Sequence, residues 1–337
     1  MCPSSGGHVA YGRLMAEPPT PAARRGRQAA RPSEIPARGW RDIFWRLWRE
    51  IQEDRVLLVA AGATFYLLLA LFPAITAFVS LYGFLADPAT IVKDIALMAT
   101  IVPAGGLDLI RERLESLASQ ADRTLSVSFI VALLFAFWSA NNGVKALFDA
   151  INIAYEETEK RSFLKLNLVA FAFTLGAMVV AAALIGAVAV VPAAIALFGP
   201  EGMSQALIQL LRWPLLLILI GAAISILYRY GPSRERAKWR WVTWGGIGAT
   251  IAWVAASIGF SFYLSNFANY EAIYGSLGAV IGFMVWTWIS VITLIVGAQL
   301  NAEMEHQTTR DSTTGEPKPM GQRGATVADT VGAPAEE

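Results

Sequence analysis

Three polar residues recur at four-residue intervals inside an otherwise apolar stretch of the chain. Asn141, Lys145 and Asp149 therefore share one face of a helix, and Asn142 lies beside them. A polar face within an apolar segment can bind an anionic solute or headgroup, and a Lys–Asp pair at this spacing can neutralise itself. The alternative is that Lys145 only reaches a membrane surface with its long side chain.

Two further polar residues, Asn301 and Glu303, follow the last apolar run of the chain. If they turn inward, they would meet the polar face of Lys145 at a similar depth. We therefore predict a shared polar site, with a solvated helix end as the alternative for these two residues. Arg212 stands next to Trp213 and would either anchor an outer interface or line a cavity. The predicted site comprises Asn141, Asn142, Lys145, Asp149, Asn301 and Glu303.

Residues for acid–base, nucleophilic or metal chemistry are scarce. Cys2 is the only cysteine, and the only histidines, His8 and His306, lie outside the apolar runs. No phosphate-binding loop, zinc-type spacing or nucleophile elbow occurs. The N-terminal arginines adjoin a membrane segment, so lipid headgroups explain them better than nucleic acid does. We predict no catalytic residue, no metal, no cofactor and no nucleic-acid partner.

The elements that would position these residues are membrane helices. Hydrophobic residues make up 55% of the chain and charged residues 16%, against roughly 45–50% and 25% in soluble domains. Six apolar runs exceed the ~20 residues that a helix needs to cross a bilayer. The third run is too short for two crossings and counts once. We predict an all-α polytopic membrane bundle with six transmembrane helices, at about 56–83, 125–148, 166–191, 207–228, 241–265 and 276–300.

The remaining segments differ in composition. Residues 1–39 are rich in Pro, Gly, Ala and Arg and are predicted to be a disordered basic arm, and 307–337 a disordered tail. Apolar residues at helical spacing over 40–51 predict an amphipathic helix that lies on the membrane surface. The alternative is a helix packed on the chain's own loops. Residues 87–123 are too polar to span and predict a small extracytoplasmic cap of two helices.

Loop charges give the orientation. The terminal segments and the alternate loops 151–165 and 229–240 carry 21 Lys and Arg, and the other loops carry 4. By the positive-inside rule, both termini would be cytoplasmic. The helix of Lys145 then begins outside, and its side chain leans into the membrane because side chains tilt toward the helix N-terminus.

Four motifs carry a family resemblance. AAGATFYLLLALFPAITAFVSLYGFLADP, NNGVKALFDAINIAYEETEKRSFLK, LYRYGPSRERAKWRWVTWGG and NFANYEAIYGSLGAVIGFMVWTWIS with GAQLNAE resemble the bacterial YihY/virulence factor BrkB family over about 40–306. The resemblance implies a six-span inner-membrane protein. Its members were formerly labelled ribonuclease BN, a misassignment, and this chain places no histidine near a carboxylate cluster. Tyr66, Lys145 and Tyr274 are among the residues that match the family pattern.

Two functions fit these features. The first is a transporter or lipid-handling permease, in which the polar face of Lys145 lines a path for an anionic solute or lipid. The alternative is a non-transporting envelope organisation or virulence and resistance factor that acts through protein partners. In both cases we expect contact with membrane lipids. We also expect association either with further copies of this chain or with another envelope protein. The sequence specifies neither a substrate nor an energy source.

Overall fold

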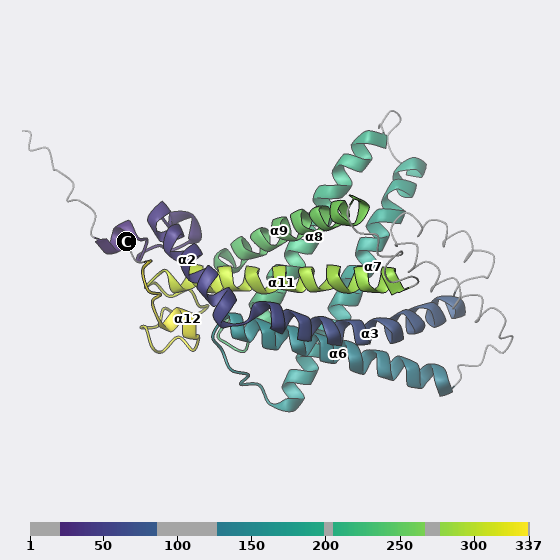
Figure 1. Ribbon diagram of the computed structural model, residues 1–337, viewed down its shortest axis with the longest axis horizontal. Coiled ribbons are helices and arrows are strands. Elements are labelled where there is room, and N and C mark those ends of the chain that lie inside the picture. The colour runs from purple at the N-terminus through teal and green to yellow at the C-terminus, as the bar shows by residue number, and fades with distance from the viewer. Residues whose placement is uncertain (1–20, 86–126, 199–204, 267–276, 336–337) are drawn as a thin grey trace, which may run out of the picture.

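The structure, a computed structural model, describes residues 21–85, 127–198, 205–266 and 277–335. Every named element within these ranges is a helix. Six long helices overlie the six predicted apolar runs and gather into one bundle (Figure 1). They are α3 (Val56–Leu85), α6 (Val127–Ala154), α7 (Phe163–Phe198), α8 (Gln205–Tyr230), α9 (Trp239–Asn266) and α11 (Gly278–His306).

Several of these helices could cross a membrane by length and composition. Four described stretches satisfy both criteria, and Val56–Ala70 is a shorter apolar stretch of α3. The chain is therefore a membrane helix bundle as predicted, whereas the count of six spans stays a prediction. The predicted cap, 87–123, lies outside the described residues. The four stretches are Phe163–Ala181, Trp213–Tyr230, Trp239–Asn266 and Val280–His306.

Small residues let the helices approach one another closely. α3 packs along α6, and α11 contacts both α3 and α9. Buried alanines such as Ala60, Ala63 and Ala298 form much of this contact. A methyl group added to Gly245 of α9 would overlap the Asn301 side chain of α11. Such packing is typical of membrane bundles, where close backbone approach takes the place of the hydrophobic effect.

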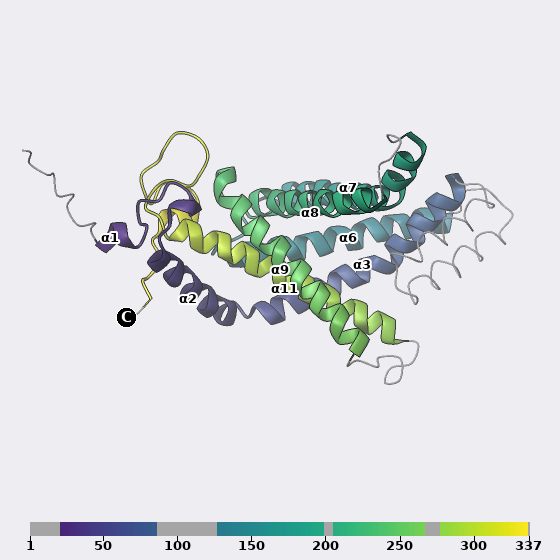
Figure 2. The same cartoon turned by 90° about the horizontal axis from the view of Figure 1, so that it is seen from above.

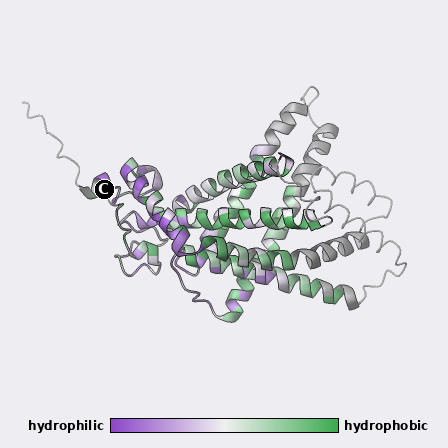
Figure 3. Ribbon diagram, in the orientation of Figure 1, coloured by the Kyte–Doolittle hydropathy of each residue, from purple (hydrophilic) through white to green (hydrophobic). Residues whose placement is uncertain are grey.

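The outer faces of the helices are apolar. Figure 3 shows hydrophobic residues along the described parts of the bundle and hydrophilic residues at the end that carries α2 (Ala37–Glu53). Leu168 on α7 and Ile251 on α9 are 67% and 65% exposed. A surface of this kind is stable against lipid tails and not against water.

The predicted disorder of residues 21–39 is wrong. They contain α1 (Pro21–Arg24), the 3-10 helix η1 (Pro32–Glu34) and the start of α2. Ala29 and Ile35 are buried in a small cluster with Trp241. A segment without apolar periodicity can still fold when distant residues, here Trp241 and Met304, supply the apolar surface on which it packs. Residues 1–20 lie outside the described residues.

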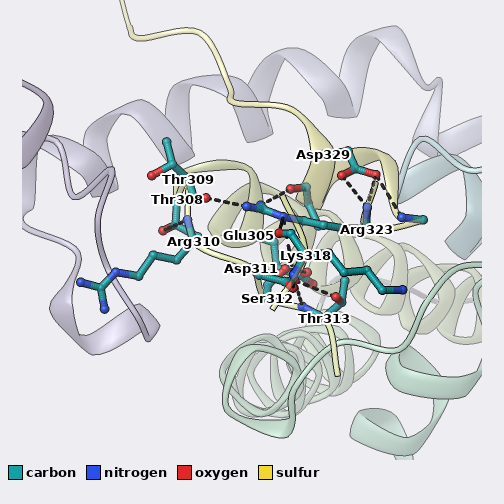
Figure 4. Close-up of polar contacts among 12 residues, drawn as sticks. Glu305, Thr308, Thr309, Arg310, Asp311, Ser312, Thr313, Lys318, Arg323 and Asp329 are labelled. Atoms are coloured by element: carbon teal, nitrogen blue, oxygen red, sulfur yellow. Dashed lines mark hydrogen bonds and ion pairs between the residues drawn. The ribbon is translucent and has the colours of Figure 1, made fainter. Parts of the chain in front are cut away.

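The predicted disorder of the C-terminal tail is also wrong, because residues 307–335 fold against the same end of the bundle and include α12 (Thr326–Asp329). Arg323 is buried, and its guanidinium donates to the Thr309 carbonyl at 2.7 Å. Asp329 accepts from the backbone N–H groups of Gly321 and Arg323 (Figure 4). Hydrogen bonds to backbone groups hold this segment, and composition does not reveal them.

Candidate functional site

Asn141 and Lys145 meet a third polar residue within the bundle. Asn167 of α7 accepts from Asn141 Nδ2 at 3.0 Å and from Lys145 Nζ at 3.1 Å, both on Oδ1. Asn167 Nδ2 donates in turn to the Phe163 carbonyl at 2.8 Å. Four-residue spacing on α6 brings the two donors to one acceptor. We call Asn141, Lys145 and Asn167 the polar triad.

Asn141 and Asn167 of the triad line a hollow of about 330 Å³ between α6 and α7, and Lys145 reaches the hollow only through its hydrogen bond to Asn167. Trp138 and Leu164 on its rim are 57% and 77% exposed, so the hollow opens on the outer face of the bundle. Asn141 Oδ1 is buried and accepts no hydrogen bond in the structure. An apolar recess thus has amide groups at one side and an ammonium group within hydrogen-bond reach of them. The hollow is lined by Phe137, Trp138, Asn141, Leu164, Asn167, Leu168 and Phe171.

The predicted Lys145–Asp149 pair does not form. Asp149 is exposed, and among the ion pairs of the described residues none joins it to Lys145, whose Nζ donates to Asn167. Lys145 donates instead to Asn167, near the start of the third apolar run, which is not among the predicted site residues. Asn142 is half-buried on the adjoining face of α6.

The prediction that Asn301 and Glu303 meet the polar face of α6 is wrong. Asn301 Oδ1 accepts from the Gly245 N–H at 2.8 Å, and its Nδ2 donates to the Val242 carbonyl at 3.2 Å. Glu303 pairs with Arg46 of α2. Gly245 has no Cβ, so the side-chain amide of Asn301 can approach the α9 backbone closely enough to form these hydrogen bonds. Glu303 faces α2 because its carboxylate pairs with the Arg46 guanidinium on that helix.

Arg46 and Glu303 form the centre of a buried charge cluster at the α2 end of the bundle. Their side chains are 1% and 5% exposed. The Arg46 guanidinium also donates to Gln307 Oε1 and to the Ala333 carbonyl, both at 2.8 Å. A buried pair of this kind is stable only when its remaining polar groups are satisfied.

Asp42 extends the cluster by one helical turn of α2. Its carboxylate accepts from Arg25 at 2.7 Å and from the Ala335 N–H at 2.9 Å. Burial alone would raise the pKa of Asp42, but these hydrogen bonds and the Arg25 charge outweigh it and lower the pKa. The four-residue spacing of Asp42 and Arg46 was the available sequence signal for this polar face.

A second buried ion pair joins Arg234 to Glu305. Arg234 Nη2 donates to Glu305 at 2.7 Å, and the side chains are 2% and 0% exposed. Ser312 of the C-terminal segment donates to the same carboxylate at 2.6 Å. Figure 4 shows Glu305 and Ser312 among the contacts of that segment. Arg234 also lies over the Tyr155 ring, 4.9 Å from its centroid. Arg234 and Glu305 are 71 residues apart, and no spacing pattern in the sequence predicts the pair.

The segment after α6 is joined to the segment after α8. Arg161 pairs with Glu159 at 2.7 Å and donates to the Gly231 carbonyl at 2.8 Å. Asn152 accepts from the Ser233 N–H at 2.7 Å. Burial acts to raise the pKa of Glu159, but the hydrogen bonds and charge of Arg161 outweigh it and lower the pKa to about 2.

The other predicted residues lie apart from the triad. Tyr66 on α3 is 44% exposed. Tyr274 and the side chain of Arg212 lie outside what the structure describes. Among the described residues, no group of three or more His, Cys, Asp or Glu side chains could hold a metal ion.

Comparison with known proteins places this architecture in a family. The family described as Virulence factor BrkB matches residues 47–321. The Putative ribonuclease-like protein YfkH of Bacillus subtilis is 32% identical over 259 residues, which cover 72% of this chain and 88% of that protein. UPF0761 membrane protein PBPRA3489 of Photobacterium profundum is 24% identical over 80% of this chain and 82% of its own length.

A UPF0761 membrane protein of Vibrio campbellii is 27% identical over 78% of this chain and 83% of its own length. No solved structure matches the chain. The family match covers the polar triad and Glu303, whereas Arg46 and Asp42 of the buried charge cluster lie outside the matched residues. The chain is a multi-pass membrane protein and belongs to the virulence factor BrkB family.

Proposed function

We propose that this protein is a lipid-handling permease that binds an anionic amphiphile at the hollow between α6 and α7. The observation that carries the proposal is an apolar, outward-opening recess lined by Asn141 and Asn167, with Lys145 Nζ hydrogen-bonded to Asn167 next to it. An amphiphile could place its chain against Trp138 and Phe171 while its headgroup accepts from Lys145 Nζ. We propose no catalytic step.

The energetics of Lys145 support this proposal. A lysine at the centre of a membrane helix costs ~2.5–3.5 kcal/mol in insertion free energy. Asn167 Oδ1 is neutral and accepts from Asn141 as well, so it offsets only part of that cost. An anionic headgroup would neutralise the ammonium group and is available in the surrounding membrane. The exposed rim gives it a path from the bilayer.

We further propose that the protein lies in a bacterial inner membrane with both termini in the cytoplasm. The support is the charge bias of the loops. Residues 21–53 and 307–335, which flank the bundle in the sequence, lie at the same end of it in Figures 1 and 2. The segments after α6 and α8, which also count as positive loops, are joined to each other by the Arg161 contacts.

The test is binding of phosphatidylglycerol by the purified full-length protein in nanodiscs, with phosphatidylcholine as the zwitterionic comparison. Lys145→Met should weaken phosphatidylglycerol binding by roughly tenfold or more, the worth of a charge-assisted hydrogen bond. Lys145→Arg should retain most of the binding. The matched control is Lys165→Met, which removes an exposed lysine from the start of α7. Equal binding by Lys145→Met and Lys165→Met would refute the proposed site.

A flux assay then separates handling from mere binding. Reconstituted vesicles with labelled phosphatidylglycerol should show protein-dependent movement between leaflets, and Lys145→Met should slow it. If neither lipid moves and crosslinking in intact cells returns a stoichiometric protein partner, the envelope-organisation hypothesis takes the place of this one.

A further inference from the structure

Helix α2 packs a mixed face, with the charged Asp42 and Arg46 beside the apolar Ile43 and Leu47, against the protein and leaves three aromatic side chains exposed. Asp42 and Arg46 are each 1% exposed. Phe44, Trp45 and Trp48 are 56%, 38% and 68% exposed. In water a helix buries its apolar stripe and exposes its charges. We call Phe44, Trp45 and Trp48 the aromatic face of α2.

The rest of the protein fixes α2 in this orientation. Arg46 is bound to Glu303 of α11 and to the Ala333 carbonyl, and Asp42 accepts from the Ala335 N–H. Rotation of the helix to bury the aromatic face would break both buried charge contacts. The folded C-terminal segment therefore holds the aromatic face outward.

Basic residues border the aromatic face. Arg38, Arg41 and Arg49 are all exposed. The guanidinium of Arg49 lies over the Trp45 ring, 4.9 Å from its centroid, and pairs with Glu53 at 3.3 Å. Tryptophan beside arginine on an exposed helix face is typical of the layer between lipid tails and water.

The aromatic face also adjoins the apolar exterior of the bundle. α2 ends at Glu53, and α3 begins at Val56 after the turn at Arg55, whose φ is 49°. Leu57 and Leu58, in the first turn of α3, are 54% and 66% exposed. Figures 1 and 2 both show α2 slanting across the end of the bundle before α3 enters it. The apolar outer surface thus continues from α3 onto α2.

We propose that the aromatic face of α2 lies in the headgroup layer of the membrane and anchors the folded cytoplasmic end to an anionic lipid surface. The rings would lie among the upper acyl chains, and Arg38, Arg41 and Arg49 would contact headgroup phosphates. This anchor resolves the two alternatives for this segment, since one face packs on the protein and the other meets lipid. It does not depend on the polar triad.

The test uses spin labels on the full-length protein in vesicles of phosphatidylglycerol and phosphatidylethanolamine. A Cys2→Ser background removes the only native cysteine. Trp48→Cys, with Phe44→Cys as a second position, places the label on the aromatic face. Ile251→Cys on the exposed outer side of α9 is the lipid reference, and Gln28→Cys, at an exposed position in the segment before α2, is the aqueous reference. Collision rates with oxygen and with a water-soluble nickel chelate are measured for each.

Labels at positions 48 and 44 should collide with nickel several-fold less often than the label at 28, and with oxygen nearly as often as the label at 251. Nickel collision as frequent as at position 28 would show that the face lies in water and would overturn the proposal. Protection from both oxygen and nickel would show that protein, and not lipid, covers the aromatic face, and would also overturn the proposal. A variant that runs as a monodisperse peak in size-exclusion chromatography before reconstitution has kept its fold. The result at either position 44 or position 48 is sufficient to test the proposal.

Discussion

Replacing Arg46 by methionine removes the guanidinium from the centre of the buried charge cluster. The Glu303 carboxylate, 5% exposed, then keeps its charge without its partner, and Gln307 Oε1 and the Ala333 carbonyl lose a donor. Removal of one partner from a buried ion pair costs ~3–5 kcal/mol in free energy of unfolding. At ~2–4 °C per kcal/mol, the midpoint of thermal unfolding should fall by roughly 6–20 °C.

The double variant Arg46→Met/Glu303→Met separates the charge effect from lost packing. It leaves no unpaired ion, so it should unfold at a higher temperature than Arg46→Met alone. Part of the loss should remain, because Gln307 and Ala333 still lack their donor. A coupling free energy of ~2 kcal/mol or more between the two sites is expected.

The assay is tryptophan fluorescence on heating in detergent at a fixed scan rate. The shifts in unfolding midpoint are compared among Arg46→Met, Glu303→Met, the double variant and the parent protein, because membrane-protein unfolding is often irreversible. An unchanged midpoint in Arg46→Met would refute the reasoning. So would strict additivity of the two single variants, because it would mean that the residues do not interact.

Three further predictions concern the same end of the bundle. Gly245→Ala should lower the unfolding midpoint because its methyl overlaps a buried amide, whereas Gly259→Ala on the same helix, where nothing lies within 4 Å, should not; equal shifts would contradict the packing described. Glu159 has a lowered pKa, so its stabilisation is complete above its usual value near 4.5 and is lost as pH falls toward about 2. Arg161→Gln should flatten that loss in pH-dependent melting, and an unchanged pH profile would exclude the pair as its cause. Deletion of 307–337 should yield aggregated protein in size-exclusion chromatography, since two buried ion pairs lose ligands, and a monodisperse peak with an unchanged midpoint would show the segment to be dispensable.

The sequence by itself determined the class of fold and the positions of the long helices. Apolar runs must become helices in a membrane because each backbone polar group has to be satisfied within its own segment. This requirement is local, so hydropathy alone located α3, α6, α7, α8, α9 and α11. Four-residue spacing correctly brought Asn141 and Lys145 together for the same reason.

Only the tertiary structure decided which polar groups meet. Arg46 and Glu303 are 257 residues apart, and Lys145 takes a partner from the next helix instead of Asp149. A buried charge is satisfied by whichever opposite charge or dipole the packing brings near it, and sequence spacing does not encode that choice. The folded C-terminal segment illustrates the same limit. Its order comes from hydrogen bonds within the segment, such as that of Arg323 to the Thr309 carbonyl, and to buried ions of distant helices, such as Asp42. These contacts leave no hydrophobic period in the chain.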